Sequence, residues 1–349
     1  MCISEQLLNW YKSHQRDLPW RKTNNPYKIW LSEIILQQTR VDQGMDYYYR
    51  FIEMFPTVQA LAQTEEQTVL RLWQGLGYYS RARNLHKTAK AIVNDHNGIF
   101  PNNYTSILQL KGIGKYTAAA IASHAFGLPF AVVDGNVYRF LARYFAIDTA
   151  IDTSAGQKTF LDLAQNILNK EKPSVHNQAI MEFGALYCKP KNPDCLNCIF
   201  VAECRAFTEK KVNVLPYKKG KTKVRNRFLN YWVIKDEDEK LFLKKRNEKD
   251  VWQNLYDFPL FESDENLLET ALFDSNAIID FIGNSRFVLK KISPVKVHLL
   301  SHQKLHIRFI ELHLSGQLHT EKELQKFTSA EIEKLPLPKP IEEFLSDFY

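Results

Sequence analysis

The chain has 349 residues, of which 45% are hydrophobic and 24% charged, with a formal net charge of +7 at pH 7. This length predicts two domains of ordinary size, and the composition excludes a disordered chain and a membrane protein. No run approaches the roughly 18 apolar residues of a spanning helix, and the first twenty residues lack the order of a signal peptide. We therefore expect no membrane partner and a cytoplasmic location. The basic charge is compatible with a nucleic acid partner but does not establish one.

The first two hundred residues have the period of amphipathic helices. Apolar side chains repeat at helical spacing from Leu7 to Tyr11, from Ile29 to Val41 and from Leu61 to Trp73. Glycine and proline turn signals separate these runs, for example at Pro56 and at Gly98 with Pro101. The pattern predicts a mostly α-helical domain over residues 1–209.

Within this domain, residues 108–122 predict two helices joined by a tight turn. The sequence LKGIGKYTA at residues 110–118 places Gly112 and Gly114 two positions apart between helix-compatible runs. Glycines at this spacing allow a tight turn and let a phosphate approach the backbone N–H groups that start the second helix. Lys115 and Lys111 add positive charge. Alone, the pattern is weak evidence for binding of a DNA backbone.

Four of the five cysteines lie in one short segment, residues 188–204. Their spacing is Cys188-x6-Cys195-x2-Cys198-x5-Cys204. In a reducing compartment such crowding favours a metal or cluster over disulfides. Zinc is the alternative occupant, but structural zinc sites usually pair two C-x2-C knuckles and only one is present here. We expect the four thiolates to hold a [4Fe-4S] cluster.

Composition and period change after the cysteines. Residues 210–227 are polar and basic and predict a linker, with contact to phosphates as an alternative role. Alternation of apolar and polar residues at 231–243, around a polar turn at 236–239, predicts a β-hairpin. Similar alternation returns at 287–292 and 307–314, and residues 266–281 have a helical period. Residues 228–349 are therefore predicted to form an α+β domain.

The order of these motifs resembles the helix-hairpin-helix DNA glycosylase superfamily, and within it the adenine DNA glycosylases of the MutY type. The Gly-x-Gly hairpin is followed by VDGNV at residues 133–137 and then by the four cysteines. The resemblance covers nearly the whole chain, including LPWR at 18–21, WLSEIILQQT at 30–39 and GLGYYSRARNL at 75–85. It implies a helical glycosylase domain with an iron–sulfur cluster loop, followed by a Nudix-like domain.

The implied activity is removal of adenine paired with 8-oxoguanine or guanine in duplex DNA, as part of base excision repair. We expect a monomer, because nothing in the sequence demands a larger assembly. The related endonuclease III type uses a lysine nucleophile where this chain has Tyr116. Lys115 lies one residue earlier, which on a helix turns its side chain about 100° away. We therefore expect a monofunctional enzyme, with a bifunctional glycosylase/AP lyase as the alternative.

Removing adenine requires an acid and an anion. Adenine leaves poorly as an anion, so it must be protonated as the N-glycosidic bond stretches, and a carboxyl group of raised pKa in a dry pocket can do this. The resemblance implies that Glu33 donates to N7 of adenine. Asp134 is expected to stabilise the oxocarbenium-like sugar, electrostatically or through a transient covalent bond. Without the surrounding motifs, Glu33 would be a solvated helix acid and Asp134 a helix N-cap.

Supporting roles in the helical domain also follow from the resemblance. Tyr116 lies beside the nucleophilic face, and Asn136 helps to hold the carboxylate or the water. Arg21 and Gln178 contact the extruded adenine. The hairpin residues Gly112, Gly114 and Lys115 hold the DNA backbone.

Adenine must leave the base stack to reach such a pocket, as in other glycosylases. Gln38 and Tyr78 are the predicted wedges, although aromatic core packing is the alternative for Tyr78. In the Nudix-like domain, Ser301 and His302 are the candidates for reading 8-oxoguanine in the opposite strand, with a purely structural hairpin as the alternative. The chain has no Gly-x5-Glu-x7-Arg-Glu-x2-Glu-Glu run, so no pyrophosphatase activity is expected.

Overall fold

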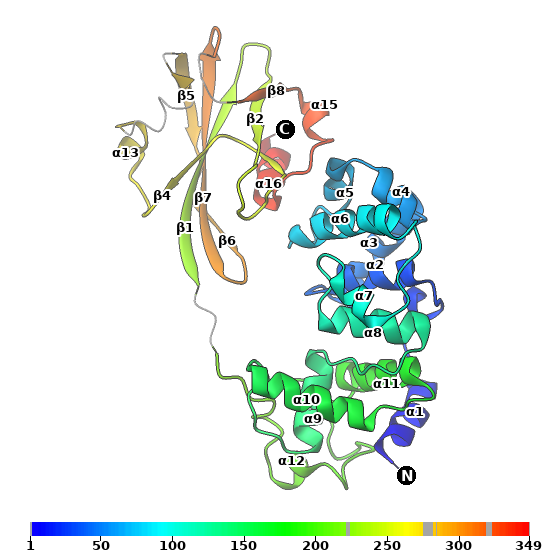
Figure 1. The fold of residues 1–349 in the computed structure, drawn as a ribbon. Coiled ribbons are helices and arrows are strands. Elements are labelled where there is room, and N and C mark those ends of the chain that lie inside the picture. The colour runs from blue at the N-terminus through cyan, green and yellow to red at the C-terminus, as the bar shows by residue number, and fades with distance from the viewer. Residues whose placement is uncertain (1, 221–223, 275–281, 284, 319–322, 349) are drawn as a thin grey trace. The chain divides into compact units, whose positions relative to one another are not determined.

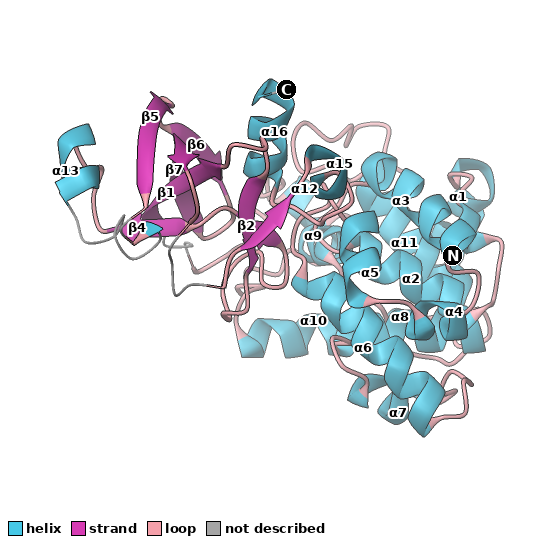
Figure 2. Cartoon of the chain, turned by 90° about the horizontal axis from the view of Figure 1, so that it is seen from above, coloured by secondary structure: helices cyan, strands magenta, loops and turns pink. Residues whose placement is uncertain are grey.

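The computed structural model describes the chain except for residues 1, 221–223, 275–281, 284, 319–322 and 349. It forms two compact units, one of residues 1–63 and 84–220 and the other of residues 64–83 and 221–349. The first unit is helical and the second is built around a β-sheet (Figures 1 and 2). None of the helices in the described part of the chain has the length and apolar character that a bilayer crossing requires.

The mostly α-helical character expected for the first two hundred residues is confirmed, although the runs at 29–41 and 61–73 are each divided between two helices. Its elements are α1 (Ile3–His14), η1 (Pro19–Arg21), α2 (Pro26–Leu36), α3 (Val41–Met54), α4 (Val58–Gln63), α7 (Tyr104–Gln109), α8 (Lys115–Phe126), α9 (Gly135–Tyr144), α10 (Ser154–Ile167), α11 (Pro173–Leu186) and α12 (Arg205–Thr208). Helix α6 (Ser80–Asp95) begins in the other unit and continues into this one, and α5 (Glu66–Leu72) belongs to the other unit.

Local sequence signals start the helices that carry the site. Asn25 caps α2 by accepting hydrogen bonds from the backbone N–H groups of Tyr27 and Lys28, and Pro26 occupies the first helical position. Asp134 caps α9 in the same way. Apolar side chains cover almost the whole circumference of α2, so it is a buried helix and Glu33 is its one acidic residue.

Helix α11 holds the site together from the centre of the helical unit. It packs against α1, α8 and α9. The buried Asn177 donates from Nδ2 to Ser123 Oγ (2.8 Å) and to the Phe130 carbonyl (2.8 Å), and its Oδ1 accepts from the backbone N–H of Val132 (3.1 Å). These bonds tie the segment that leads into Asp134 to two helices, so the loop before α9 has a fixed path.

In the residues that the structure describes, the second unit contains an eight-stranded mixed sheet. Its elements are β1 (Arg225–Lys235), β2 (Leu241–Lys245), β3 (Tyr256–Asp257), β4 (Leu260–Ser263), α13 (Glu269–Asp274), β5 (Arg286–Ile292), β6 (Lys296–Leu299), β7 (Gln303–Ser315), β8 (Gln325–Phe327), α15 (Ser329–Ile332) and α16 (Lys339–Phe348). The main path of the sheet runs β3-β2-β1-β7-β5, and β4, β6 and β8 pair with β1, β7 and β2.

The long strands β1 and β7 run parallel through the middle of this sheet, in register from Arg225 with Gln303 to Lys235 with His313 (Figure 1). Strand β1 is buried on both faces, as a central parallel strand should be. One face packs around Trp232, and on the other Phe309 stacks on Phe344 of α16 with ring centroids 4.0 Å apart. The sheet therefore has a hydrophobic core on each side.

The predicted β-hairpin is confirmed, since β1 and β2 pair antiparallel with Lys235 opposite Leu241. The alternating segments at 287–292 and 307–314 lie in β5 and β7. Part of the predicted helix over 266–281 is present as α13, while residues 275–281 lie outside the described residues. Strand β1 begins at Arg225, within the predicted linker over 210–227.

One of the linker's basic residues is not available to DNA phosphates. Arg227 is buried and forms ion pairs with Asp250 (2.7 Å) and Glu262 (2.5 Å). Residues 64–83 join the sheet unit through hydrogen bonds from Asn254 to Glu66 (2.5 Å) and from Arg83 to the carbonyl of Gln253 (2.8 Å). Hydrophobic periodicity gives no sign of these contacts, and the predicted boundaries at 209 and 228 stay predictions.

Candidate active site

One cavity of the helical unit brings together six of the residues expected in the site. They are Arg21, Glu33, Tyr116, Asp134, Asn136 and Gln178. They come from η1, α2, α8, the start of α9 and α11, which are up to 157 positions apart in sequence (178 − 21). The two carboxyl groups, Glu33 and Asp134, thus face the same space.

Glu33 has the environment of a general acid. Burial raises the pKa of its carboxyl group to about 7; a hydrogen bond from Tyr116 acts in the opposite direction, and the charge of Asp134 adds to the increase. Tyr116 is held beside it at the start of α8, and burial together with the two nearby carboxylates raises the pKa of Tyr116 well above its usual value. Near neutral pH a large share of Glu33 therefore carries a proton.

Asp134, which is partly buried, has the environment of a stabilised anion. Its Oδ1 accepts from the backbone N–H groups of Asn136 and Val137 (both 2.8 Å), and its Oδ2 accepts from Asn136 Nδ2 (2.7 Å). Burial raises the pKa of Asp134, while these three hydrogen bonds and the charge of Arg139 oppose the increase. Its position at the N-terminus of α9 also favours negative charge.

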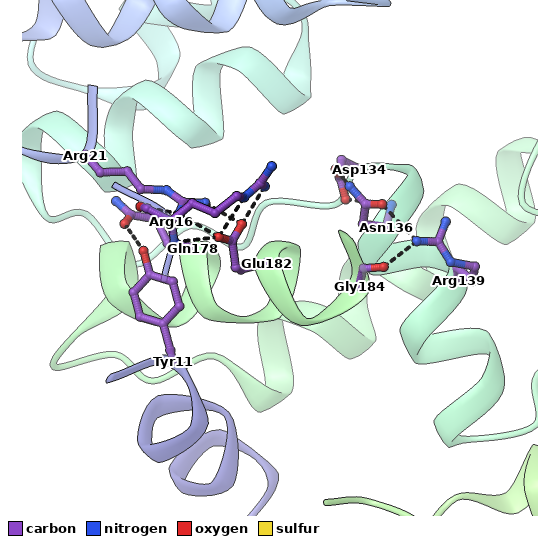
Figure 3. Close-up of polar contacts among 9 residues, drawn as sticks. All are labelled: Tyr11, Arg16, Arg21, Asp134, Asn136, Arg139, Gln178, Glu182 and Gly184. Carbon is purple, nitrogen blue, oxygen red and sulfur yellow. Dashed lines mark hydrogen bonds and ion pairs between the residues drawn. The ribbon is translucent and has the colours of Figure 1, made fainter. Parts of the chain in front are cut away.

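A chain of contacts fixes Asn136 behind Asp134 (Figure 3). Arg139 donates to Asn136 Oδ1 (2.9 Å), to the Gly184 carbonyl (2.6 Å) and to the Cys188 carbonyl (2.7 Å). A Cβ atom on Gly184 would lie 2.7 Å from the Asn136 carbonyl oxygen, so only glycine permits this approach of α11 to α9. One arginine therefore joins Asn136, which holds Asp134, to the cysteine segment.

Arg21 lies in the cavity, but its guanidinium group is not free. It pairs with Glu182 through Nη1 to Oε1 (3.0 Å) and Nη2 to Oε2 (2.8 Å), and Arg16 binds the same carboxylate (2.6 Å, Nη2 to Oε2; Figure 3). Burial acts to raise the pKa of Glu182, but the hydrogen bonds and charges of the two arginines lower it to about 2. Glu182 thus remains ionised and orients Arg21.

The helix-hairpin-helix turn has the expected geometry. Gly112 has φ +77°, and a Cβ atom there would lie 2.7 Å from the Asn84 side chain. Any other residue at this position would have a strained backbone and would clash with Asn84. At Gly114, the N-cap of α8, a Cβ atom would meet no atom within 4 Å, which leaves the N-terminus of α8 open. Lys115 follows on the exposed surface.

The two predicted wedge residues share an unusual backbone. Gln38 has φ +58° and Tyr78 has φ +48°, a left-handed conformation that costs a side-chain-bearing residue energy and is concentrated at functional sites. Gln38 is exposed and does not line the active-site cavity. Tyr78 is also exposed, which disagrees with the alternative of aromatic core packing.

A second cavity, in the sheet unit, contains the predicted lesion-reading residues. Tyr78, Ser301 and His302 line it together with Arg83 and Trp252. The hydroxyl groups of Tyr78 and Ser301 form a hydrogen bond. The sequence placed Tyr78 and Ser301 in separate roles, and the structure brings them into direct contact.

The four cysteines of the 188–204 segment line a further cavity, together with aromatic side chains of the helical core such as Phe140, Phe183 and Phe200. They form no disulfide. Arg143 donates to Cys188 Sγ (3.5 Å) and to the carbonyls of Lys189 (2.7 Å) and Pro190 (3.2 Å), which ties the loop to α9. In the described residues no three potential ligands converge on one point as a single metal ion requires. Four thiols that line one cavity are the kind of ligand set that an iron–sulfur cluster requires.

Several residues that shape the site were not expected from the sequence: Arg16, His124, Arg139, Glu182 and Gly184. One of them carried a signal. Glu182 is a lone acid in the apolar run AIMEFGAL at 179–186, where an unpaired charge would be costly. The contacts of Arg139 and Gly184 depend on how α9 crosses α11, which no local pattern reveals.

Comparison with known proteins identifies the family of each unit. Residues 31–166 match the HhH-GPD superfamily of base excision DNA repair proteins, and residues 230–347 match the NUDIX domain. A solved thermostable thymine-DNA glycosylase superposes with a TM-score of 0.56 at 30% identity, over 59% of this chain and 95% of that chain. The fold is therefore that of a helix-hairpin-helix DNA glycosylase followed by a Nudix domain.

Two relatives narrow the class. The adenine DNA glycosylase of Buchnera aphidicola subsp. Baizongia pistaciae is 37% identical over 310 residues, covering 88% of this chain and 85% of the relative. That of subsp. Schizaphis graminum is 35% identical over 350 residues, covering 99% and 98%. The chain belongs to the adenine DNA glycosylases, hydrolases that act on N-glycosyl bonds.

Proposed function

We propose that this chain is a monofunctional glycosylase that releases adenine paired with 8-oxoguanine or guanine in duplex DNA. The observation that carries the proposal is the shared cavity of Glu33 and Asp134, in which one carboxyl group has a pKa of about 7 and the other accepts three hydrogen bonds. An acid and an anion on one nucleotide are the two groups that breaking a purine N-glycosidic bond requires.

In the proposed reaction, Glu33 gives its proton to N7 of the extruded adenine as the bond to the sugar breaks. The base then leaves neutral rather than as an anion. Tyr116 holds Glu33 in place through their hydrogen bond. The same cavity contains Gln178 and Arg21, which we assign to the adenine itself.

Asp134 stabilises the positive charge that develops on the sugar, and Asn136 holds the carboxylate through its side-chain amide. Water completes the hydrolysis. Tyr116 stands where the lyase relatives have a lysine. Its hydroxyl group has a raised pKa and forms a hydrogen bond with Glu33. It cannot form a Schiff base, so strand cleavage is not part of the proposed reaction.

The four cysteines are proposed to hold a [4Fe-4S] cluster, which would hold the 188–204 loop folded against α9. Burial raises the pKa of the Cys198 thiol, and a bound metal centre would favour the thiolate form that ligates metals. Purified protein should be yellow-brown and contain iron near four per chain, the count of such a cluster. A colourless, zinc-loaded and fully active preparation would contradict this assignment.

Duplex DNA is the proposed partner of a monomeric, cytoplasmic enzyme. The hairpin residues Gly112, Gly114 and Lys115 are assigned to the DNA backbone, and Gln38 and Tyr78 to the space left by the extruded nucleotide. The cavity of Tyr78, Ser301 and His302 is assigned to 8-oxoguanine, which the hydroxyl pair can meet with both a donor and an acceptor.

The test is a glycosylase assay on matched duplexes with a single adenine opposite 8-oxoguanine, guanine or thymine. Base release and strand nicking are scored separately. We expect release opposite 8-oxoguanine and, more slowly, guanine, with nicking only after alkali treatment. Nicking without alkali, with a borohydride-trapped covalent complex, would instead show the bifunctional lyase; no release from any duplex would refute the proposal.

A further inference from the structure

The cavity lined by Tyr78, Ser301 and His302 contains one carboxylate. Among the described side chains that line it, Asp250 is the one acidic residue. Its side chain is 29% exposed, and Trp252 of the same loop lines the cavity as well. The loop between β2 and β3 therefore brings an accessible negative charge to the space that we assign to 8-oxoguanine.

Two buried arginines hold this carboxylate. Arg227 of β1 donates from Nη1 to Asp250 Oδ1 (2.9 Å) and from Nη2 to Oδ2 (2.7 Å), and Arg246 Nη2 donates to Oδ2 (3.1 Å). The two parallel bonds from Arg227 fix the plane of the carboxylate. Burial acts to raise the pKa of Asp250, but hydrogen bonds from Arg227 and the Val251 backbone, with the charges of both arginines, lower it. Asp250 is therefore ionised at neutral pH.

An ionised carboxylate accepts hydrogen bonds and cannot donate them. The hydroxyl groups of Tyr78 and Ser301 can take either role, as can the ring of His302, so these groups can bind guanine and 8-oxoguanine alike. Arg83 only donates, and it can donate to N7 of guanine or to O8 of the oxidised base. Among the described side chains that line the cavity, Asp250 alone is restricted to accepting.

Guanine and 8-oxoguanine differ in the role of one ring nitrogen. N7 of guanine carries a lone pair and accepts hydrogen bonds. In 8-oxoguanine, oxygen is bound to C8 and N7 carries a hydrogen, so the same nitrogen donates. A carboxylate next to N7 therefore gains a hydrogen bond from the oxidised base. Beside guanine the same carboxylate faces a lone pair, and both acceptors remain unpaired.

We infer that Asp250 is a specificity-determining residue, whose carboxylate accepts a hydrogen bond from N7–H of 8-oxoguanine and disfavours guanine in the same place. The inference deepens the proposed function and rests on the assignment of this cavity to 8-oxoguanine. Arg227 and Arg246 are positioning residues, because they hold the carboxylate and do not line the cavity.

A purely structural ion pair is the alternative role of Asp250, and a second carboxylate provides the matched control. Arg227 also pairs with Glu262 (2.5 Å), whose side chain is 33% exposed but does not line the cavity. Asp250 and Glu262 thus bind the same guanidinium group and differ in their access to a ligand. A structural role predicts similar effects when either charge is removed, whereas contact with the base predicts an effect on specificity for Asp250 alone.

The experiment measures single-turnover release of adenine opposite 8-oxoguanine and opposite guanine by the full-length enzyme, below saturation so that binding contributes. Asp250→Asn keeps the shape of the side chain but adds an N–H group that can donate to N7 of guanine. It should lower the ratio of the two rates by about tenfold, the scale of one hydrogen bond to a charged group. Glu262→Gln should keep the ratio within about twofold of wild type. The ratio cancels a general loss of activity from a structural defect.

A base analogue gives a second readout that needs no variant. In 7-deazaguanine a C–H group replaces N7, so the base presents no lone pair to the carboxylate. The wild-type enzyme should release adenine opposite 7-deazaguanine about threefold or more faster than opposite guanine, because an unpaired acceptor is removed. Asp250→Asn should abolish this difference.

The inference is overturned if folded Asp250→Asn keeps the ratio of 8-oxoguanine to guanine rates within about twofold of wild type. It is equally overturned if Glu262→Gln lowers that ratio as much as Asp250→Asn. These outcomes differ from failure of the proposed function, in which the wild-type enzyme releases no adenine or does not prefer 8-oxoguanine. If Asp250→Asn does not fold, the wild-type comparison decides, and equal rates opposite guanine and 7-deazaguanine overturn the inference.

Discussion

Replacing Glu182 by glutamine removes one negative charge while keeping the shape of the side chain, and we expect it to destabilise the helical unit. The Glu182 side chain is fully buried, and its two oxygens accept from Arg16 and Arg21. In the Glu182→Gln variant, the largely buried Arg21 lies beside a neutral amide. The amide nitrogen is itself a donor, so it cannot accept the hydrogen bond of the guanidinium group that faces it. Removing one member of a buried ion pair leaves the other charge buried and uncompensated, which is strongly destabilising.

The magnitude follows from the pKa of Glu182, which the two arginines lower from its usual 4.5 to about 2 against the opposing effect of burial. At about 1.4 kcal/mol per unit, this difference corresponds to about 3 kcal/mol of folding free energy. Because the folded-state pKa is depressed, this contribution is fully present above pH 4.5 and is lost as the pH falls toward 2. For a unit of this size, about 3 kcal/mol corresponds to roughly 6–12 °C in melting temperature.

Thermal unfolding at pH 7 and at pH 3.5 measures both the size and the pH dependence. Asp162→Asn is the matched control, because it neutralises an acid whose ion pair with Lys158 is exposed and worth less than about 1 kcal/mol. We expect a clear loss for Glu182→Gln at pH 7 and a smaller difference from wild type at pH 3.5. Equal melting temperatures for the two variants at pH 7 would refute the reasoning.

Three further predictions concern the reaction and the cysteine loop. The single-turnover rate should be constant below pH 6 and fall about tenfold per unit above pH 7, because Glu33 must be protonated and its pKa is raised to about 7; a rate unchanged to pH 9 would exclude it as the acid. Gly184→Ala should slow base release by about 100-fold while DNA binding changes little, because the 2.7 Å contact displaces Asn136 and with it Asp134; a wild-type rate in a folded variant disagrees with this. Arg143→Met should lower the iron content below wild type after chelator treatment, since three bonds to the loop are lost, and equal retention would show that the loop holds the metal without it.

The sequence predicted the parts of the site that have short motifs. The hairpin LKGIGKYTA, the VDGNV segment and the cysteine spacing each act locally, and the structure gives them the expected turn, helix start and shared cavity. Glu33 was placed by the resemblance that the segment at residues 30–39 carries, and in the structure it is the one acidic residue of the apolar helix α2. These features depend on neighbours within one or two helical turns, which a single sequence displays.

The remaining features depend on how distant helices cross. Arg21 is predicted to contact adenine. No local pattern indicates that its guanidinium group also pairs with Glu182, which lies on a helix more than 150 residues away in the sequence. Single hydrogen bonds link α1 to α11, from Tyr11 to Gln178, and α8 to α11, between His124 and Ser174. The contact between Tyr78 and Ser301 joins two distant loops. No periodicity encodes such pairings. Composition also gives no sign that Arg227, a basic residue of the predicted linker, is buried in ion pairs with Asp250 and Glu262.

The central claim is that one protonated carboxyl group and one carboxylate act on the same nucleotide. The most direct test is single-turnover release of adenine from an adenine:8-oxoguanine duplex by Glu33→Gln and Asp134→Asn, with duplex affinity measured alongside. We predict that each substitution slows release by at least about 1,000-fold, the scale of losing a positioned acid or a charge-stabilising group, while affinity stays within a few-fold of wild type. Release at near wild-type rates by either variant would contradict the account.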